Sequence, residues 1–90
     1  MSAGPVLEAG EVANAIVAAI RELDPSVRVV DRGAYVRVAA ERRCRVTRVA
    51  IERALGRPFR LPGDLEAVMP SFSGRFTVTD DDAVWELAGS

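Results

Sequence analysis

The strongest constraint on the fold is a run of alternating residues near the middle of the chain. It starts in residues 31–41, where Asp-Arg-Gly is typical of a tight turn because glycine accepts the positive φ that such turns require. The residues that follow alternate, so that Val36, Val38 and Ala40 share one face. The preceding β-branched run, residues 27–30, is the natural partner strand. The pattern predicts a β-hairpin at the centre of the domain.

Two helices are predicted on either side of this hairpin. The first opens at residues 10–11 and ends at residues 24–25, where proline forces the preceding residue out of the helical region. The second spans residues 48–55, with Thr47 as its N-cap and Gly56 after its end. The predicted apolar face of the first helix is Val12, Ile16, Ala19, Ile20 and Leu23, and that of the second is Val49, Ile51, Ala54 and Leu55.

The remaining segments are shorter. Residues 4–7 are predicted as an edge strand that begins with proline, and residues 43–47 as a strand with Cys44 facing inward. Residues 62–69 are expected to form one or two helical turns, and residues 71–74 a flexible polar loop around Phe72. Residues 75–79 and 83–88 form the last hairpin, with Trp85 and Leu87 facing inward.

A weak internal repeat relates the first and second halves of the chain. Residues 31–39 align with residues 80–88, which pairs Val36 with Trp85 and Val38 with Leu87. Each hairpin follows a helix, and each helix follows a short strand. We therefore predict an α+β fold in which two βαββ-like halves pack around one core, with two to three helices and antiparallel hairpins. Residues 1–90 form a single domain, because the length leaves no room for a second core.

The side-chain inventory excludes most enzyme classes. There is no histidine and one cysteine, too few for a structural zinc site, an iron–sulfur cluster or a disulfide framework. Histidine-based proton transfer is excluded, and no phosphate-binding glycine motif is present. The turn at residues 80–82 is interpreted as solvated rather than as a calcium site. We expect a non-catalytic binding domain without cofactor or metal. The single cysteine, with no signal sequence or membrane span, favours the cytoplasm.

Charge is unevenly distributed along the chain. The net charge is −1, but residues 42–60 carry seven arginines and one acid, whereas residues 61–90 carry six acids and one arginine. Such a block can attract an acidic partner, or it can be a solvated face, and we favour the solvated face. Arginine-driven RNA binding is a weaker alternative, because the block lacks interleaved aromatic residues.

Several motifs together resemble one protein family. They are residues 29–41 (VVDRGAYVRVAAE), Thr47-Arg48, residues 55–59 (LGRPF) and residues 71–74 (SFSG), in this order and spacing. The chain resembles the effector, or coupling, proteins of bacterial multicomponent soluble diiron monooxygenases, and most nearly the toluene monooxygenase branch. The phenol hydroxylase and methane monooxygenase regulatory proteins look more distant. The likeness extends from residue 4 to about residue 87.

The resemblance implies a cofactor-free protein that docks on the diiron hydroxylase of its own monooxygenase. There it would tune substrate access, oxygen activation and the coupling of NADH use to hydroxylation or epoxidation of a hydrocarbon. It implies no catalytic residue of its own, no nucleic-acid or membrane partner, and a monomer when free. The loop after the short third helix is the docking segment that the resemblance indicates. The predicted docking residues are Met69, Pro70, Ser71, Phe72, Ser73, Gly74 and Arg75, together with Arg42 and Arg43.

One alternative function stays open at this point. A ferredoxin-like regulatory domain that binds a small molecule also uses βαββ units, and it would need a hydrophobic pocket between helix and sheet. The motifs do not name the hydrocarbon, because substrate chemistry would belong to the hydroxylase.

Overall fold

The fold consists of two antiparallel sheets and three helices in the computed structural model, which describes residues 1–88. The strands are β1 (Gly4–Glu8), β2 (Arg28–Asp31), β3 (Tyr35–Ala39), β4 (Arg43–Thr47), β5 (Ser71–Ser73), β6 (Arg75–Val78) and β7 (Asp82–Glu86). The helices are α1 (Glu11–Leu23), α2 (Arg48–Leu55) and α3 (Gly63–Glu66). Among these helices, none has both the length and the apolar character needed to cross a membrane.

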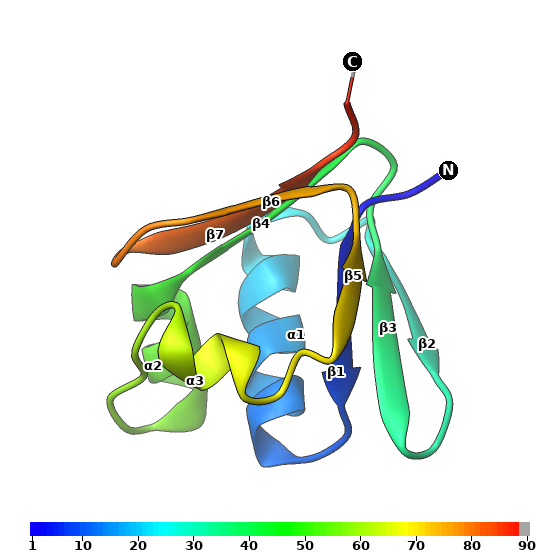
Figure 1. Cartoon of the computed structure of the whole chain (residues 1–90). Coiled ribbons are helices and arrows are strands. Elements are labelled where there is room, and N and C mark those ends of the chain that lie inside the picture. The colour runs from blue at the N-terminus through cyan, green and yellow to red at the C-terminus, as the bar shows by residue number, and fades with distance from the viewer. Residues whose placement is uncertain (89–90) are drawn as a thin grey trace.

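The two halves of the chain repeat one arrangement. The four-stranded sheet has the order β2-β3-β1-β5, and the three-stranded sheet has the order β4-β7-β6. In each half the first strand, β1 or β4, pairs antiparallel with the last strand of the hairpin that follows the helix. The predicted α+β fold of two βαββ-like halves is therefore confirmed. Figure 1 shows the three helices on one side of the four-stranded sheet, with the three-stranded sheet across the top of α1.

The central hairpin forms as predicted. In the register of β2 and β3, Val29 lies opposite Val38, and both Val36 and Val38 are buried. The turn is closed by the Asp31 carboxylate, which accepts a hydrogen bond of 2.8 Å from the amide of Gly33. Gly33 has a φ of 79°, the conformation for which the sequence supplies glycine.

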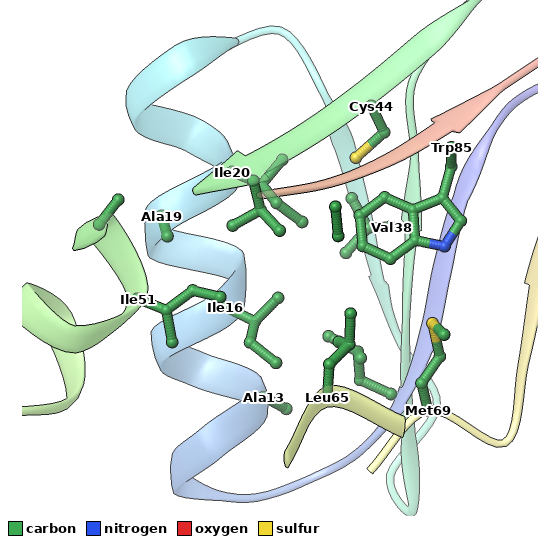
Figure 2. Close-up of a cluster of buried hydrophobic side chains, with 14 of the residues drawn as sticks. Ala13, Ile16, Ala19, Ile20, Val38, Cys44, Ile51, Leu65, Met69 and Trp85 are labelled. Atoms are coloured by element: carbon green, nitrogen blue, oxygen red, sulfur yellow. The ribbon is translucent and has the colours of Figure 1, made fainter. Parts of the chain in front are cut away.

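The core lies between α1 and the two sheets (Figure 2). Its largest fully buried side chain is Trp85 of β7, and Cys44 and Val46 of β4 are also buried, as predicted for that strand. The helix bounds are close to the expected ones, and the Thr47 hydroxyl caps α2 by accepting from the amide of Ala50 at 3.2 Å. The fully or nearly fully buried residues of the helices are Ala13, Ala15, Ile16, Ala19, Ile20, Ala50, Ile51 and Leu65.

The helix faces differ from the prediction at their edges. Leu23 and Val49, both expected to face the core, are 49% and 54% exposed. Leu23 is the last residue of α1, beyond the part of the helix that the sheets cover. In α2, Ile51 is buried as predicted, but Ala50 is buried in place of Val49, and Ala54 is exposed. A helix of two turns carries too few apolar residues for its periodicity to fix that face.

The prediction of residues 4–7 as an edge strand is wrong. β1 lies inside the four-stranded sheet, between β3 and β5. Its pairing with β3 includes the reciprocal hydrogen bonds of Ala3 and Ala40, both 2.8 Å long, and resumes at Val6 opposite Arg37. Pro5, which has no amide hydrogen, falls in the gap between these two points. An interior strand accepts the proline because the ladder is interrupted only there.

The prediction of residues 71–74 as a flexible loop is also wrong. Residues Ser71–Ser73 form β5, which pairs with β1 so that Phe72 lies opposite Pro5. Three residues of mixed polarity carry no period-two signal, and the partner strand is some 65 positions away in sequence. Local pattern therefore could not reveal this strand.

Candidate functional site

The edge strand β5 carries the most exposed aromatic side chain of the second half of the chain, Phe72. This residue is 45% exposed, yet its ring lies 5.3 Å from that of Phe76 in β6. The ring of Phe76 in turn stacks on Trp85 at 5.3 Å, with an angle of 26° between the planes. Three aromatic rings thus connect the surface of β5 to the centre of the core. An exposed aromatic supported in this way presents a large apolar contact area in one fixed position.

The innermost ring of this row has one unusual feature. The indole Nε1 of Trp85 is buried and has no hydrogen-bond partner among residues 1–88. In Figure 2 the indole lies beside Cys44 and above Met69, in apolar surroundings. The Trp85 side chain therefore contributes through packing, not through a hydrogen bond.

The other predicted docking residues around β5 divide into accessible and inaccessible ones. Pro70 and Ser71 are exposed, and Ser73 is partly exposed. Met69 is 9% exposed and belongs to the core (Figure 2), so its side chain is not available to a partner in this conformation. The structure thus contradicts Met69 as a surface residue.

Gly74 forms the corner between the two sheets. It has a φ of 96°, and a Cβ placed there would lie 3.0 Å from the carbonyl oxygen of Glu86 and 3.2 Å from the Cβ of Ala3. Both the backbone conformation and the space at this position require glycine. The close approach allows the chain to pass directly from β5 in one sheet to β6 in the other, which fixes where Phe72 and Arg75 project.

The predicted arginines gather near this corner. In the three-stranded sheet, Glu86 lies opposite Arg43 of β4 on one side and Arg75 of β6 on the other. Arg43 makes a long ion pair with Glu86, at 3.7 Å, and both side chains are about half exposed. Arg42 is exposed in the turn between β3 and β4, and its carbonyl accepts from the amide of Leu87. Residues far apart in sequence are therefore brought to one end of this sheet.

Most of the arginine block is neutralised by the fold. Besides Arg43, four of its members make ion pairs of 2.8–2.9 Å, and three of these pairs join segments that are distant in sequence. These four pairs are Arg45 with Asp82, Arg48 with Glu52, Arg53 with Glu22 and Arg57 with Glu11. The positive charge of residues 42–60 is thus largely paired with acids from other segments. This pairing agrees with the solvated face that the sequence favoured over an attraction site for an acidic partner.

Two titratable groups have clearly shifted pKa values, and both are structural. Burial, with a smaller contribution from the charge of Asp24, raises the pKa of the Cys44 thiol to about 12. A thiol with such a pKa is not a nucleophile at neutral pH. Hydrogen bonds from Arg45 and then Thr79 hold the pKa of Asp82 below its usual value. Among residues 1–88, no three histidine, cysteine or acidic side chains are clustered so as to hold a metal ion.

Surface hollows are present but modest. One of about 480 Å³ is an open groove between α1 and α2, lined in part by Gly10, Asn14 and Ala18. Another, of about 260 Å³, lies between the end of α1 and β4. Ligand sites commonly occupy roughly 300–1,000 Å³ and enclose most of the ligand. The open groove lies between two helices, and the hollow beside the sheet is small, so neither favours a small-molecule sensor.

Sequence reasoning missed a second group of exposed residues, on the outer face of the four-stranded sheet. Val30 and Tyr35 are 38% and 45% exposed, and Arg37 is exposed between Val36 and Val38. The alternation of the central strand places Tyr35 and Arg37 on the face opposite Val36 and Val38. The available signal was this alternation, but nothing in the sequence indicated that no helix would cover that face.

Comparison with known proteins agrees with this architecture. The family model described as MmoB/DmpM matches residues 1–86. The effector subunit of an alkene monooxygenase system from Xanthobacter autotrophicus is 45% identical over 84 residues, which are 91% of this chain and 82% of that protein.

Solved structures share the fold. A chain in the structure of the phenol hydroxylase–regulatory protein complex has a TM-score of 0.84 at 22% identity, covering 96% of this chain and 98% of that one. The soluble methane monooxygenase regulatory protein B has a TM-score of 0.70 at 24% identity, covering 94% of this chain and 64% of that one. With a family model spanning nearly the whole sequence, this chain belongs to the MmoB/DmpM family.

Proposed function

We propose that this protein is a non-catalytic effector that binds the diiron hydroxylase of its own monooxygenase. The relative named an alkene monooxygenase effector subunit and the structure named a phenol hydroxylase–regulatory protein complex support this proposal. The chain itself offers no clustered metal ligands among residues 1–88 and a thiol with a strongly raised pKa. Its contribution to the reaction is therefore to bind and to change the hydroxylase, not to transform substrate.

Phe72 is the main structural support for this proposal, because its exposed ring is held in place by packing on Phe76. Exposed aromatics on a rigid base are typical centres of binding interfaces, since they bury much area at little entropic cost. Phe72 stands on the edge strand with Ser71 and Ser73 beside it, and its ring rests on Phe76. Ser71 and Ser73 point to the opposite face of the strand, and the second ring keeps Phe72 from turning into the core.

In the bound state, we propose that β5 and the adjoining corner, with Arg75, Arg42 and Arg43, contact the hydroxylase surface over its active site. Binding of this rigid edge shifts the hydroxylase toward the conformation that the edge fits better, because a ligand stabilises the state to which it binds more tightly. Such a shift would tune substrate access, oxygen activation and the coupling of NADH use to hydroxylation or epoxidation. We expect the free protein to be monomeric and cytoplasmic.

Reconstitution of the monooxygenase tests the function directly. The protein is titrated into its cognate hydroxylase, electron-transfer components and NADH, and product formed is compared with NADH consumed. We expect the ratio of product to NADH to rise to a plateau as the effector saturates the hydroxylase. An unchanged ratio and turnover at saturating effector would refute the proposal.

Phe72→Ala tests the edge of β5. We expect the variant to lose binding by about 2 kcal/mol, the scale of an interface hot spot, and to lower coupling accordingly. Unfolding stability should change by less than about 1 kcal/mol, because the ring is nearly half exposed. Val49→Ala is the matched control, since Val49 is 54% exposed on α2, away from the edge strand. Equal effects of both variants on coupling would remove β5 from the site.

A further inference from the structure

The arginines that lack ion pairs are not scattered evenly over the surface. Within residues 1–88, five of the twelve arginines make ion pairs, and all five belong to the block between residues 42 and 60. Of the remaining seven, three lie in the β2–β3 hairpin and two at the junctions of the sheets. The hairpin carries Arg28, Arg32 and Arg37, and the junctions carry Arg42 and Arg75.

Arg37 is the best placed of these residues. It lies on the solvent side of the four-stranded sheet, with Val30 of β2 opposite it on one side and Val6 of β1 on the other. Ser71 of β5 follows Val6 in the same row, about 10 Å from Arg37 at two strand spacings. These two valines are its cross-strand neighbours, a setting in which the aliphatic stem of an arginine can pack while the guanidinium stays in solvent. Each strand of the sheet therefore contributes one residue to this row.

The charges that face this row are few. Glu8 of β1, opposite Tyr35 and one step along the strand, is the acid diagonal to Arg37. No ion pair within 4.0 Å joins them in the described part of the chain. Arg28, farther along β2, lines a hollow together with Glu41 and lies outside this row. Arg37 is thus the cation of this face with an apolar row around it and no acid in contact.

The same face is apolar and low in relief. Val30 and Tyr35 are more than a third exposed, while Ala39, Ser71 and Ser73 are small. Figure 1 shows the helices on the other side of this sheet, which leaves the outer face of β1, β2 and β3 uncovered. A surface of this kind permits close approach of another protein surface, with one fixed positive charge near its centre.

We propose that the outer face of the four-stranded sheet is a second contact surface for the hydroxylase, and that Arg37 binds a carboxylate cluster there. This inference rests on the proposed function, since the hydroxylase is the partner. The row Val30–Arg37–Val6–Ser71 ends on the edge strand β5, where Ser71 directly precedes Phe72. The two side chains lie on opposite faces of that strand, so a partner that covers this edge contacts both surfaces. Guanidinium matches carboxylate geometry with two parallel hydrogen bonds, which makes acidic side chains its natural partners.

RNA is the other polyanion that an arginine and a tyrosine on an open sheet can contact. The observations favour protein carboxylates, because Tyr35 is the one exposed aromatic on this face within residues 1–88 and the chain carries a net charge of −1. Binding of single-stranded nucleic acid usually uses successive aromatic platforms in a positively charged groove. The test includes RNA as a separate measurement.

The test compares two arginine-to-glutamine variants that remove the same charge from different places. Arg37→Gln changes the proposed face, and Arg21→Gln changes an exposed arginine near the end of α1 that also makes no ion pair within residues 1–88. Affinity for the cognate hydroxylase is measured by titration calorimetry between about 0.05 and 0.3 M salt, a range over which screening is strong. Thermal unfolding of both variants shows that the fold is kept.

We expect Arg37→Gln to bind on the order of fivefold more weakly at low salt, with a flatter salt dependence, and Arg21→Gln to bind like wild type. If the wild type binds the hydroxylase and both variants bind it with the same affinity as each other, the Arg37 contact is overturned and the effector function stands. Failure of the wild type to bind the hydroxylase would overturn both. Salt-dependent RNA binding lost in Arg37→Gln, with hydroxylase binding unchanged, would reassign the face to nucleic acid.

Discussion

The two sheets share a topology but differ in how their polar faces are used. On the three-stranded sheet, Arg45 pairs with Asp82 at 2.9 Å, and Asp82 also accepts from the Thr79 hydroxyl at 2.9 Å. On the four-stranded sheet, Arg37 has valines on both sides and no ion pair among the described residues. The three-stranded sheet pairs Arg43 and Arg45 with its own acids, and the four-stranded sheet presents charge and apolar area together to solvent.

We propose that the three-stranded sheet is mainly structural, whereas the four-stranded sheet and its edge strand carry most of the contact with the partner. Internal repetition leaves two similar surfaces, and a partner needs only one of them. The three-stranded sheet supplies Trp85 and Phe76, which support the ring of Phe72 at the edge of the other sheet. The supporting rings therefore belong to the three-stranded sheet and the exposed ring to the four-stranded sheet, and Gly74 is the point where the two sheets join.

The largest loss of stability is expected at Trp85, which lies in the core shared by both halves. Trp85→Ala removes the largest fully buried side chain and should destabilise the protein by about 3–5 kcal/mol, enough to abolish folding in a domain of marginal stability. Urea unfolding followed by far-UV circular dichroism measures this, since the variant lacks the only tryptophan.

Trp85→Phe serves as the control for that variant. It keeps an aromatic ring against Phe76 and removes the five-membered part of the indole, including an N–H that has no partner among residues 1–88, so a smaller loss of roughly 1–2 kcal/mol is expected. Equal losses for the alanine and phenylalanine variants would mean that a ring stacked on Phe76 does not stabilise the fold.

Gly74→Ala tests the corner between the sheets. The positive φ and the approach of Glu86 and Ala3 predict a loss of about 1–3 kcal/mol in unfolding free energy, together with a displaced β5. Gly63→Ala is the matched control, because nothing lies within 4 Å of a Cβ at Gly63 in α3. That change should be neutral or stabilising by roughly 0.5–1 kcal/mol. A harmless Gly74→Ala would show that the two sheets can separate freely.

Asp82→Asn tests the internally paired face and should have the smallest effect. Since the folded-state pKa of Asp82 is lowered by Arg45 and Thr79, its contribution is present above the unfolded value near 3.9 and is lost as pH falls through the folded value. We expect a loss of about 0.5–1 kcal/mol at pH 7 that shrinks below about pH 4. Urea midpoints at both pH values measure it. A loss that persists unchanged at low pH would exclude the ion pair as its cause.

A further carboxylate provides the reference for this measurement. Glu66→Gln removes an exposed charge at the end of α3 that makes no ion pair within residues 1–88. Its midpoint should follow wild type at both pH values. A shift as large as that of Asp82→Asn would indicate an effect of net charge alone.

Much of the fold could be predicted because its signals are local. The turn at Gly33, the alternation through Val36 and Val38, and the cap at Thr47 all depend on neighbours within a few residues. Such patterns act through backbone sterics and short-range hydrogen bonds, which are the same wherever the segment lies. The candidate site was found only in part. The sequence indicated the segment around Phe72, but it did not distinguish exposed Ser71 from buried Met69.

By itself, the sequence determined the hairpins, the main helices, the repeated βαββ order and the family. Only the tertiary structure decided that residues Ser71–Ser73 are a strand, that Phe72 rests on Phe76 and Trp85, and that the arginine block is largely neutralised. Each of these features joins segments that are far apart in the chain. Strand pairing, ring stacking and ion pairing depend on distance in space, whereas a sequence pattern records only distance along the chain.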